Sequence, residues 1–152
     1  MDTTNRLLTK DEIMKIVHPQ LTIWDLEWKM QQSIIDLETL AQRYPHATPE
    51  KLYRSQITKQ KLTEAKYRDN IREVEKNLST FENQVQEAEE QSKKVEQAEA
   101  KDLLEEIILR VNGTIESLHV MKGKAIRGEE DARTTQGCWE EILRSTEGTA
   151  GR

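Results

Sequence analysis

The stretch that decides the fold is YRDNIREVEKNLSTFENQVQEAEEQSKKV, residues 67–95, in which apolar residues recur at alternating intervals of four and three. This 3.5-residue period is typical of a helix that pairs with another helix along one seam. Position d of the heptad holds Tyr67, Val74, Phe81, Ala88 and Val95, and position a holds Ile71, Leu78, Val85 and Ser92. A seam this thin cannot be buried by the helix itself, so the pattern predicts a long coiled-coil helix with a helical partner.

The rows beside the seam differ in charge. Position e carries Arg68, Glu75, Glu82, Glu89 and Glu96, whereas position g carries Asn70, Asn77, Gln84 and Gln91. In a parallel homodimer the glutamates would face amides, and in an antiparallel one they would face glutamates. The pattern therefore favours a different helix that carries Lys or Arg. The alternative is a solvated face, because exposed pairs contribute only about 0.2–0.5 kcal/mol each.

Start and stop signals divide the N-terminal part of the chain. Thr9 and Glu12 have the spacing of a capping box before a short helix that ends at Pro19. Thr22 can cap a second helix that reaches about Tyr44, and Thr48-Pro49 marks the start of the next. Residues 21–48 are thus expected to form one amphipathic helix and a turn, which leads into an N-terminal helical hairpin.

This second helix carries a further apolar stripe, formed by Trp24, Trp28 and Ile35, outside its own heptad seam. A helix that is apolar on two sides is usually buried on both, which predicts a bundle of three or more helices within the protein or its obligate complex. The alternative is an exposed docking site, because Trp is enriched among the residues that dominate binding energy.

Beyond Val95 the register changes, and a new seam begins with Leu104, Ile108 and Val111. The absence of a strong helix breaker from Pro49 onward predicts one helix over residues 49–112, ended by Asn112-Gly113. We expect a third helical segment and linker over residues 113–128. A short amphipathic helix containing Trp139, with a polar tail, is expected over residues 129–152, either as a docking motif or as a last helix of a bundle.

Together these features predict an elongated all-α protein with an N-terminal segment over residues 1–20, a helical hairpin, a long coiled-coil helix and a C-terminal helical segment. Another chain, or a bend that folds the C-terminal part back, must cover the long seam. Twelve positions are expected to contact partner helices: Ile71, Val74, Leu78, Phe81, Val85, Trp24, Trp28, Ile35, Leu104, Ile108, Val111 and Trp139.

Composition and motifs argue against several classes of function. The net charge of −5 disfavours general binding to nucleic acid, although basic residues cluster between Lys51 and Arg72. No apolar run approaches the ~18 residues of a membrane span, and a lone Cys138 fits an intracellular protein of the cytoplasm or nucleus. The three histidines have no zinc-ligand spacing, so no metal is expected. No glycine-rich phosphate loop follows a strand, and no His is placed to activate Cys138, so neither a cofactor, a small-molecule substrate nor catalysis is expected.

In composition the chain resembles the small coiled-coil subunits of eukaryotic assemblies such as kinetochore and tethering complexes. The resemblance implies a non-catalytic scaffold that holds other helical chains in a hetero-oligomer. The alternative is a compact helical bundle that acts as an adaptor or chaperone for a client protein. That alternative requires the long helix to bend near residues 99–102, so that the second seam packs back on the first hairpin.

Overall fold

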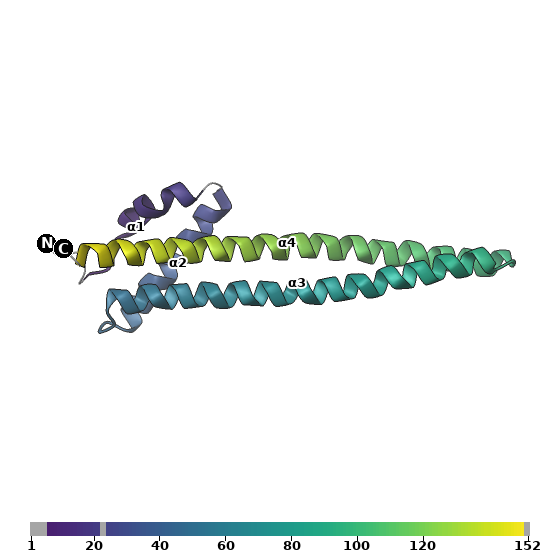
Figure 1. The fold of residues 1–152 in the computed structure, drawn as a ribbon, viewed down its shortest axis with the longest axis horizontal. Coiled ribbons are helices and arrows are strands. Elements are labelled where there is room, and N and C mark those ends of the chain that lie inside the picture. Colours follow the sequence, from purple (N-terminus) through teal and green to yellow (C-terminus); the bar gives the residue numbers. More distant parts are fainter. Residues whose placement is uncertain (1–5, 22–23, 151–152) are drawn as a thin grey trace. The chain divides into compact units, whose positions relative to one another are not determined.

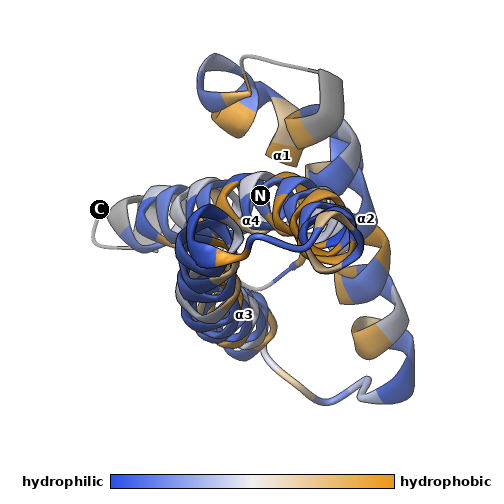
Figure 2. Ribbon diagram, turned by 90° about the vertical axis from the view of Figure 1, so that its right-hand side faces the viewer, coloured by the Kyte–Doolittle hydropathy of each residue, from blue (hydrophilic) through white to orange (hydrophobic). Residues whose placement is uncertain are grey.

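The computed structural model describes residues 6–21 and 24–150, without the side chains of residues 24, 25 and 148–150. The fold is all-α, and the described residues contain no strand. Within the described residues four α-helices follow one another: α1 (Lys10–Val17), α2 (Trp24–Arg43), α3 (Pro49–Lys94) and α4 (Ala98–Ala150), with a short 3-10 helix η2 (His18–Gln20) after α1 (Figure 1). Figure 2 shows apolar and polar residues interspersed along all of these helices.

The chain divides into two compact units, and both α3 and α4 contribute to each. The first comprises Met1–Ala65 with Glu129–Arg152 and is called here the four-helix unit. The second comprises Lys66–Gly128 and is called the hairpin unit.

The helix starts predicted for α1 and α3 are confirmed. Thr9 Oγ1 accepts a hydrogen bond from Glu12 N at 3.2 Å, and Glu12 Oε1 accepts one from Thr9 N at 3.0 Å. Thr48 Oγ1 accepts from Lys51 N at 3.3 Å, with Pro49 as the first helical residue of α3. Pro fits there because the first backbone N–H of a helix has no intrahelical acceptor. The predicted cap Thr22 lies outside the described residues.

The core of the four-helix unit is built from all four helices. Ile13 and Val17 of α1, and Met30 of α2, are fully buried. Their neighbours in the same cluster come from α2, the start of α3 and the end of α4: Ile34, Leu37, Leu52, Tyr53, Ile57, Cys138, Trp139, Ile142 and Leu143. The cluster is continuous because each helix presents apolar residues at intervals of three and four along one side.

In the hairpin unit, the second half of α3 and the first half of α4 run antiparallel (Figure 1). Residues 95–97 connect them. Val95 N still donates to Gln91 O at 3.1 Å, and Lys101 N already donates to Gln97 O at 3.1 Å. The reversal is therefore tight, with helical hydrogen bonds on both sides of it.

Two predicted boundaries are wrong. The helix expected over residues 49–112 ends at Lys94, and α4 continues through Gly113 to Ala150 without the expected break, linker or separate short helix. Each helical glycine costs only about 1 kcal/mol relative to alanine, which the packing of a long helix outweighs. The reversal at residues 95–97 uses neither Gly nor Pro, so only the change of heptad register marked its position.

The reversal also identifies what covers the α3 seam. Val74 and Leu78 are only 7% and 5% exposed, and Lys122 Nζ of α4 lies 3.4 Å from Glu75 Oε1 of α3. The seam is covered by α4 of the same chain, which is the second of the two possibilities that the sequence left open.

Candidate functional site

The four-helix unit contains a chain of buried polar groups that fixes Trp139. Trp139 Nε1 donates to Ser33 Oγ at 2.7 Å, and Ser33 Oγ donates to Gln56 Oε1 at 2.9 Å. Gln56 Nε2 donates to Asp36 Oδ2 at 2.8 Å, and Lys59 Nζ lies 3.0 Å from the same oxygen. Each buried donor thus has an acceptor, as groups removed from water require. The role of this series of hydrogen bonds is to orient the core residue Trp139.

Tyr53 stacks on Trp139, with ring centroids 6.1 Å apart and an angle of 24° between the rings. The Tyr53 hydroxyl accepts a hydrogen bond from Leu8 N at 3.0 Å. Burial raises the pKa of Tyr53, so the neutral hydroxyl is retained. For Asp36, burial raises the pKa, but hydrogen bonds from Gln56 and Lys59 lower it by more, which keeps the carboxylate charged.

Trp139 was predicted as a partner contact but is fully buried within its own chain. Of the two interpretations of the C-terminal segment, the return to the bundle is therefore the one realised. The heptad seam of α2 runs through Leu26, Met30, Leu37 and Leu40, and Ser33 is a polar residue within it. Its Oγ lies 2.7 Å from the indole nitrogen of Trp139. Sequence reasoning missed Gln56, because a single glutamine carries no spacing pattern.

The second stripe on α2 is exposed. Trp28 and Ile35 are 50% and 52% exposed, although Met30 and Leu37 on the other side of the same helix are fully or almost fully buried. The expected burial of the second side of α2 does not occur within this chain at Trp28 and Ile35. The helices of the unit pack on the opposite side of α2, which carries Met30, Ile34 and Leu37. The side chain of Trp24, the third member of the stripe, lies outside the described part of the chain.

The hairpin unit brings together the remaining predicted contacts. Its seam joins residues of α3 with residues of α4: Ile71, Phe81 and Val85 with Leu104, Ile108 and Val111. These six side chains are only partly buried, because two helices alone cannot enclose them. Large apolar side chains beside this seam are exposed, among them Leu103 (62%), Ile107 (49%) and Met121 (54%). Both seams were predicted from the sequence, whereas the exposure of Met121 was missed.

A groove of about 530 Å³ lies along the hairpin, bordered by Tyr67 and Val74 of α3 and by Leu118, Met121 and Ala125 of α4. Asn70, Glu73 and Asn77 line its α3 edge, and Lys124 lies on its α4 edge. The groove is mostly apolar, and its few polar groups do not form a set of converging catalytic side chains.

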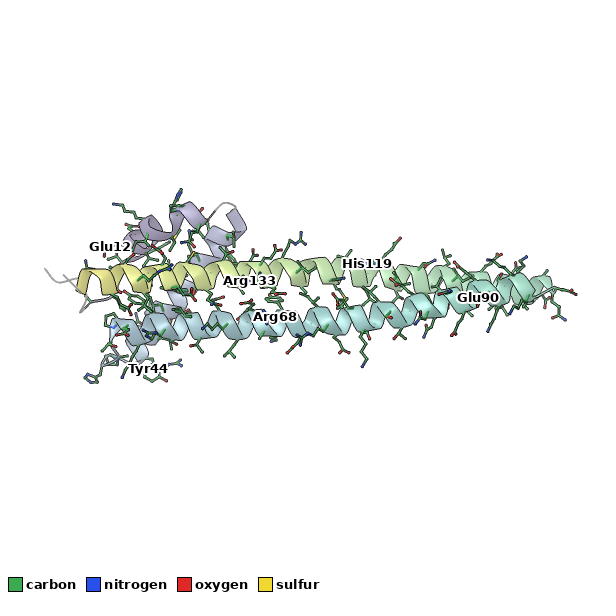
Figure 3. The ribbon with its side chains drawn as sticks, viewed as in Figure 1. Glu12, Tyr44, Arg68, Glu90, His119 and Arg133 are labelled. Carbon is green, nitrogen blue, oxygen red and sulfur yellow. The ribbon has the colours of Figure 1, made fainter. Side chains whose placement is uncertain are left out.

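Among the basic residues between Lys51 and Arg72, Arg54, Lys59 and Arg72 each have an acidic partner. Arg54 pairs with Glu50 and with Glu147. Arg133 of α4, labelled in Figure 3, lies 3.1 Å from Glu64 Oε1 of α3 and 2.9 Å from Glu129 Oε1. These pairs favour charge patterning over a nucleic-acid contact for this region.

Among the described residues, no group of three or more His, Cys, Asp or Glu side chains is placed to hold a metal ion. Within those residues there is also no helix whose length and apolar content would let it cross a membrane. Comparisons of the chain with protein-family models, curated proteins and solved structures gave no match.

Proposed function

We propose that the chain is a non-catalytic interaction subunit, which holds other helical proteins in a hetero-oligomeric assembly inside the cell. The observation that carries this proposal is the outer face of α2, where Trp28 and Ile35 are each about half exposed. They lie seven residues apart, which is two helical turns on one side of the helix.

The energetics of this face favour a protein partner. Burying one large apolar side chain contributes about 1.5–3 kcal/mol, and tryptophan is the residue most enriched at the centres of interfaces. A partner helix with an apolar side, laid across α2, would remove both side chains from water. Glu27 and Glu38 are exposed on the same helix, which suits a partner with flanking Lys or Arg.

The test is quantitative affinity purification of the tagged chain from its own cells, comparing the wild type with the double variant Trp28→Ser, Ile35→Ser. We expect at least one protein to co-purify in stoichiometric amount with the wild type and to be lost with the double variant. Circular dichroism must show that helicity is retained. Lys61→Ser, an exposed change on α3 in the same unit and away from this face, is the matched control. An identical set of proteins with both variants would overturn the proposal.

A second candidate function is an adaptor or chaperone that binds a client transiently. The back-folding at residues 95–97 and the apolar groove in the hairpin unit favour it. It differs from the first in kinetics: a client would bind weakly and exchange, whereas an assembly subunit would remain in a complex of fixed stoichiometry. Analytical ultracentrifugation of the purified complex separates the two.

A further inference from the structure

The hairpin unit has two unlike sides. The Lys122–Glu75 ion pair lies on the side that carries the glutamate row of α3. The groove lies on the other side, where Asn70 and Asn77 of α3 border it together with Met121 of α4. The glutamates at position e of α3, which disfavour pairing of this seam with a second copy, belong to the first side.

The groove side continues along both helices. Residues seven apart share one face of a helix in such a pair, and the less exposed positions of α4 keep alternating intervals of four and three. Gln84 and Gln91 therefore follow Asn77 along α3, and Ile107 and Thr114 precede Met121 along α4. This surface is called here the amide face, and its members are Asn70, Asn77, Gln84, Gln91, Ile107, Thr114 and Met121.

We infer that the amide face binds a second copy of this chain, so that two hairpins pack antiparallel as a four-helix bundle. The two halves of the amide face match each other. Ile107 lies seven residues before Thr114, and Met121 lies seven residues after it. A two-fold axis in the plane of the interface at the level of Thr114 sets Ile107 of each copy against Met121 of the other.

The same axis brings an exposed apolar residue of each copy to the level of the groove of the other. Leu103 lies eleven residues before Thr114, and Ala125 lies eleven residues after it in the groove wall. The exposed Leu103 of each copy thus lies level with the groove of the other. All of these apolar side chains gain burial that one hairpin cannot supply.

Charge favours the antiparallel arrangement. The Lys122–Glu75 contact places Thr114 level with about residue 83 of α3, eight residues away in each helix. Between residues 82 and 113, the segment next to the turn, acidic residues outnumber basic ones: Glu82, Glu87, Glu89, Glu90, Glu96, Glu99, Asp102, Glu105 and Glu106 against Lys93, Lys94, Lys101 and Arg110. Glu90, labelled in Figure 3, lies in this segment.

Away from the turn the balance is reversed. Residues 66–81 and 115–128 carry Lys66, Arg68, Arg72, Lys76, Lys122, Lys124 and Arg127 against Asp69, Glu73, Glu75 and Glu116. In the antiparallel dimer the acidic half of each hairpin overlies the basic half of the other. A parallel dimer would place the acidic half of one hairpin against the acidic half of the other, which costs free energy. The residues of the amide face itself carry no charge, so they disfavour neither the antiparallel nor the parallel dimer.

The test is sedimentation velocity and light scattering of the full chain over a concentration series. We expect the wild type to dimerise, and Ile107→Asp or Met121→Lys to weaken the dimer by about tenfold or more, because each buries a charge against an apolar residue. The double variant Ile107→Asp, Met121→Lys should recover the dimer, since each aspartate then faces a lysine of the other copy. Val120→Asp, an exposed change on the same helix outside the amide face, should have no effect.

The axis is tested separately by cysteine cross-linking in a Cys138→Ser background. Thr114→Cys should form a disulfide-linked dimer on mild oxidation, and the control Glu116→Cys should not. A monomeric wild type at high concentration, a dimer that Ile107→Asp leaves unchanged, or a double variant that stays monomeric would each overturn the inference. A different protein bound at this face in place of a second copy would do the same. These outcomes are independent of the α2 test, because the two sets of variants lie on different helices.

Discussion

The Tyr67 ring lies directly over Gly128: a Cβ atom added to the glycine would meet Cζ of the ring at 2.5 Å and Cε1 at 2.6 Å. The two residues come from α3 and α4 within the hairpin unit. Tyr67 is one of the larger residues of the α3 seam, and only a position without a side chain lets α4 approach it this closely. Gly128 is therefore a packing residue inside a continuous helix.

Replacing Gly128 should destabilise the protein even though alanine is the better helix former. We expect Gly128→Ala to lower the free energy of unfolding by about 1–3 kcal/mol, because the Tyr67 ring must leave its place. Gly113 is the matched control, since a Cβ added there meets nothing within 4 Å. Gly113→Ala should raise the free energy of unfolding by about 1 kcal/mol. Urea denaturation measures both, and equal gains for the two variants would contradict the packing role.

The contrast between these glycines explains why the end of the long helix was predicted wrongly. From sequence, Gly113 and Gly128 are both potential helix breaks, and the Asn112-Gly113 pair favours a turn. Whether the helix continues through these glycines depends on the tertiary packing of α4, which no local sequence pattern encodes. The two seams of the hairpin could be predicted, because heptad spacing is a property of the sequence. Which chain covers them could not, because a tight reversal at residues 95–97 needs no special residue.

Trp139 and Ser33 should behave as a coupled pair. Trp139→Phe keeps the stack on Tyr53 but removes the Nε1–H donor, and Ser33→Ala removes its acceptor. We expect each change to cost about 1–3 kcal/mol, because a buried polar group is left without its partner. The double variant should cost less than the two single costs added together. Guanidinium denaturation of the four proteins tests this, with the exposed change Ser79→Ala as a control that should stay within about 0.5 kcal/mol of the wild type. Strict additivity would contradict the coupling.

The same pair shows how far the candidate site could be predicted. The apolar stripe of α2 and the spacing of Trp139, Ile142 and Leu143 are visible in the sequence, but not which residues end up inside. Trp139 contacts Ser33 across more than a hundred residues of sequence. Trp28 has the same side chain and is half exposed, because the core of the unit lies on the opposite side of α2. Burial of a tryptophan depends on this arrangement, which single-sequence periodicity does not determine.

Cys138 should be inert in the folded protein. Its side chain is fully buried, its Sγ lies 3.8 Å from Gln20 Oε1, and burial raises its pKa to about 11. Because the thiolate is the reactive form, little of it exists near neutral pH. We expect negligible reaction with a disulfide reagent in native buffer and complete reaction of one thiol in guanidinium chloride. Ser79→Cys in a Cys138→Ser background supplies an exposed thiol as the control. Rapid native labelling of Cys138 would contradict its placement in the core.

Glu12 should make the stability of α1 depend on pH. Arg6 donates to both carboxylate oxygens, at 2.8 and 3.0 Å, and with the backbone N–H of Thr9 it lowers the pKa of Glu12 to about 2. The ordinary value is about 4.3. Because the folded-state pKa is the lower one, the stabilisation is complete above the ordinary value and is lost as the pH falls towards 2.

We therefore expect the free energy of unfolding of the wild type to fall more steeply than that of Glu12→Gln between about pH 4.5 and pH 2. Glutamine can still accept the hydrogen bond from Thr9 N, so the capping box is kept while the charge is removed. The difference between the two proteins should be largest at neutral pH and should shrink through this range. Arg6→Gln, which removes the cation and leaves the carboxylate, should flatten the profile in the same direction. Urea denaturation at a series of pH values measures all three, and parallel profiles for wild type and Glu12→Gln would exclude a lowered pKa at Glu12.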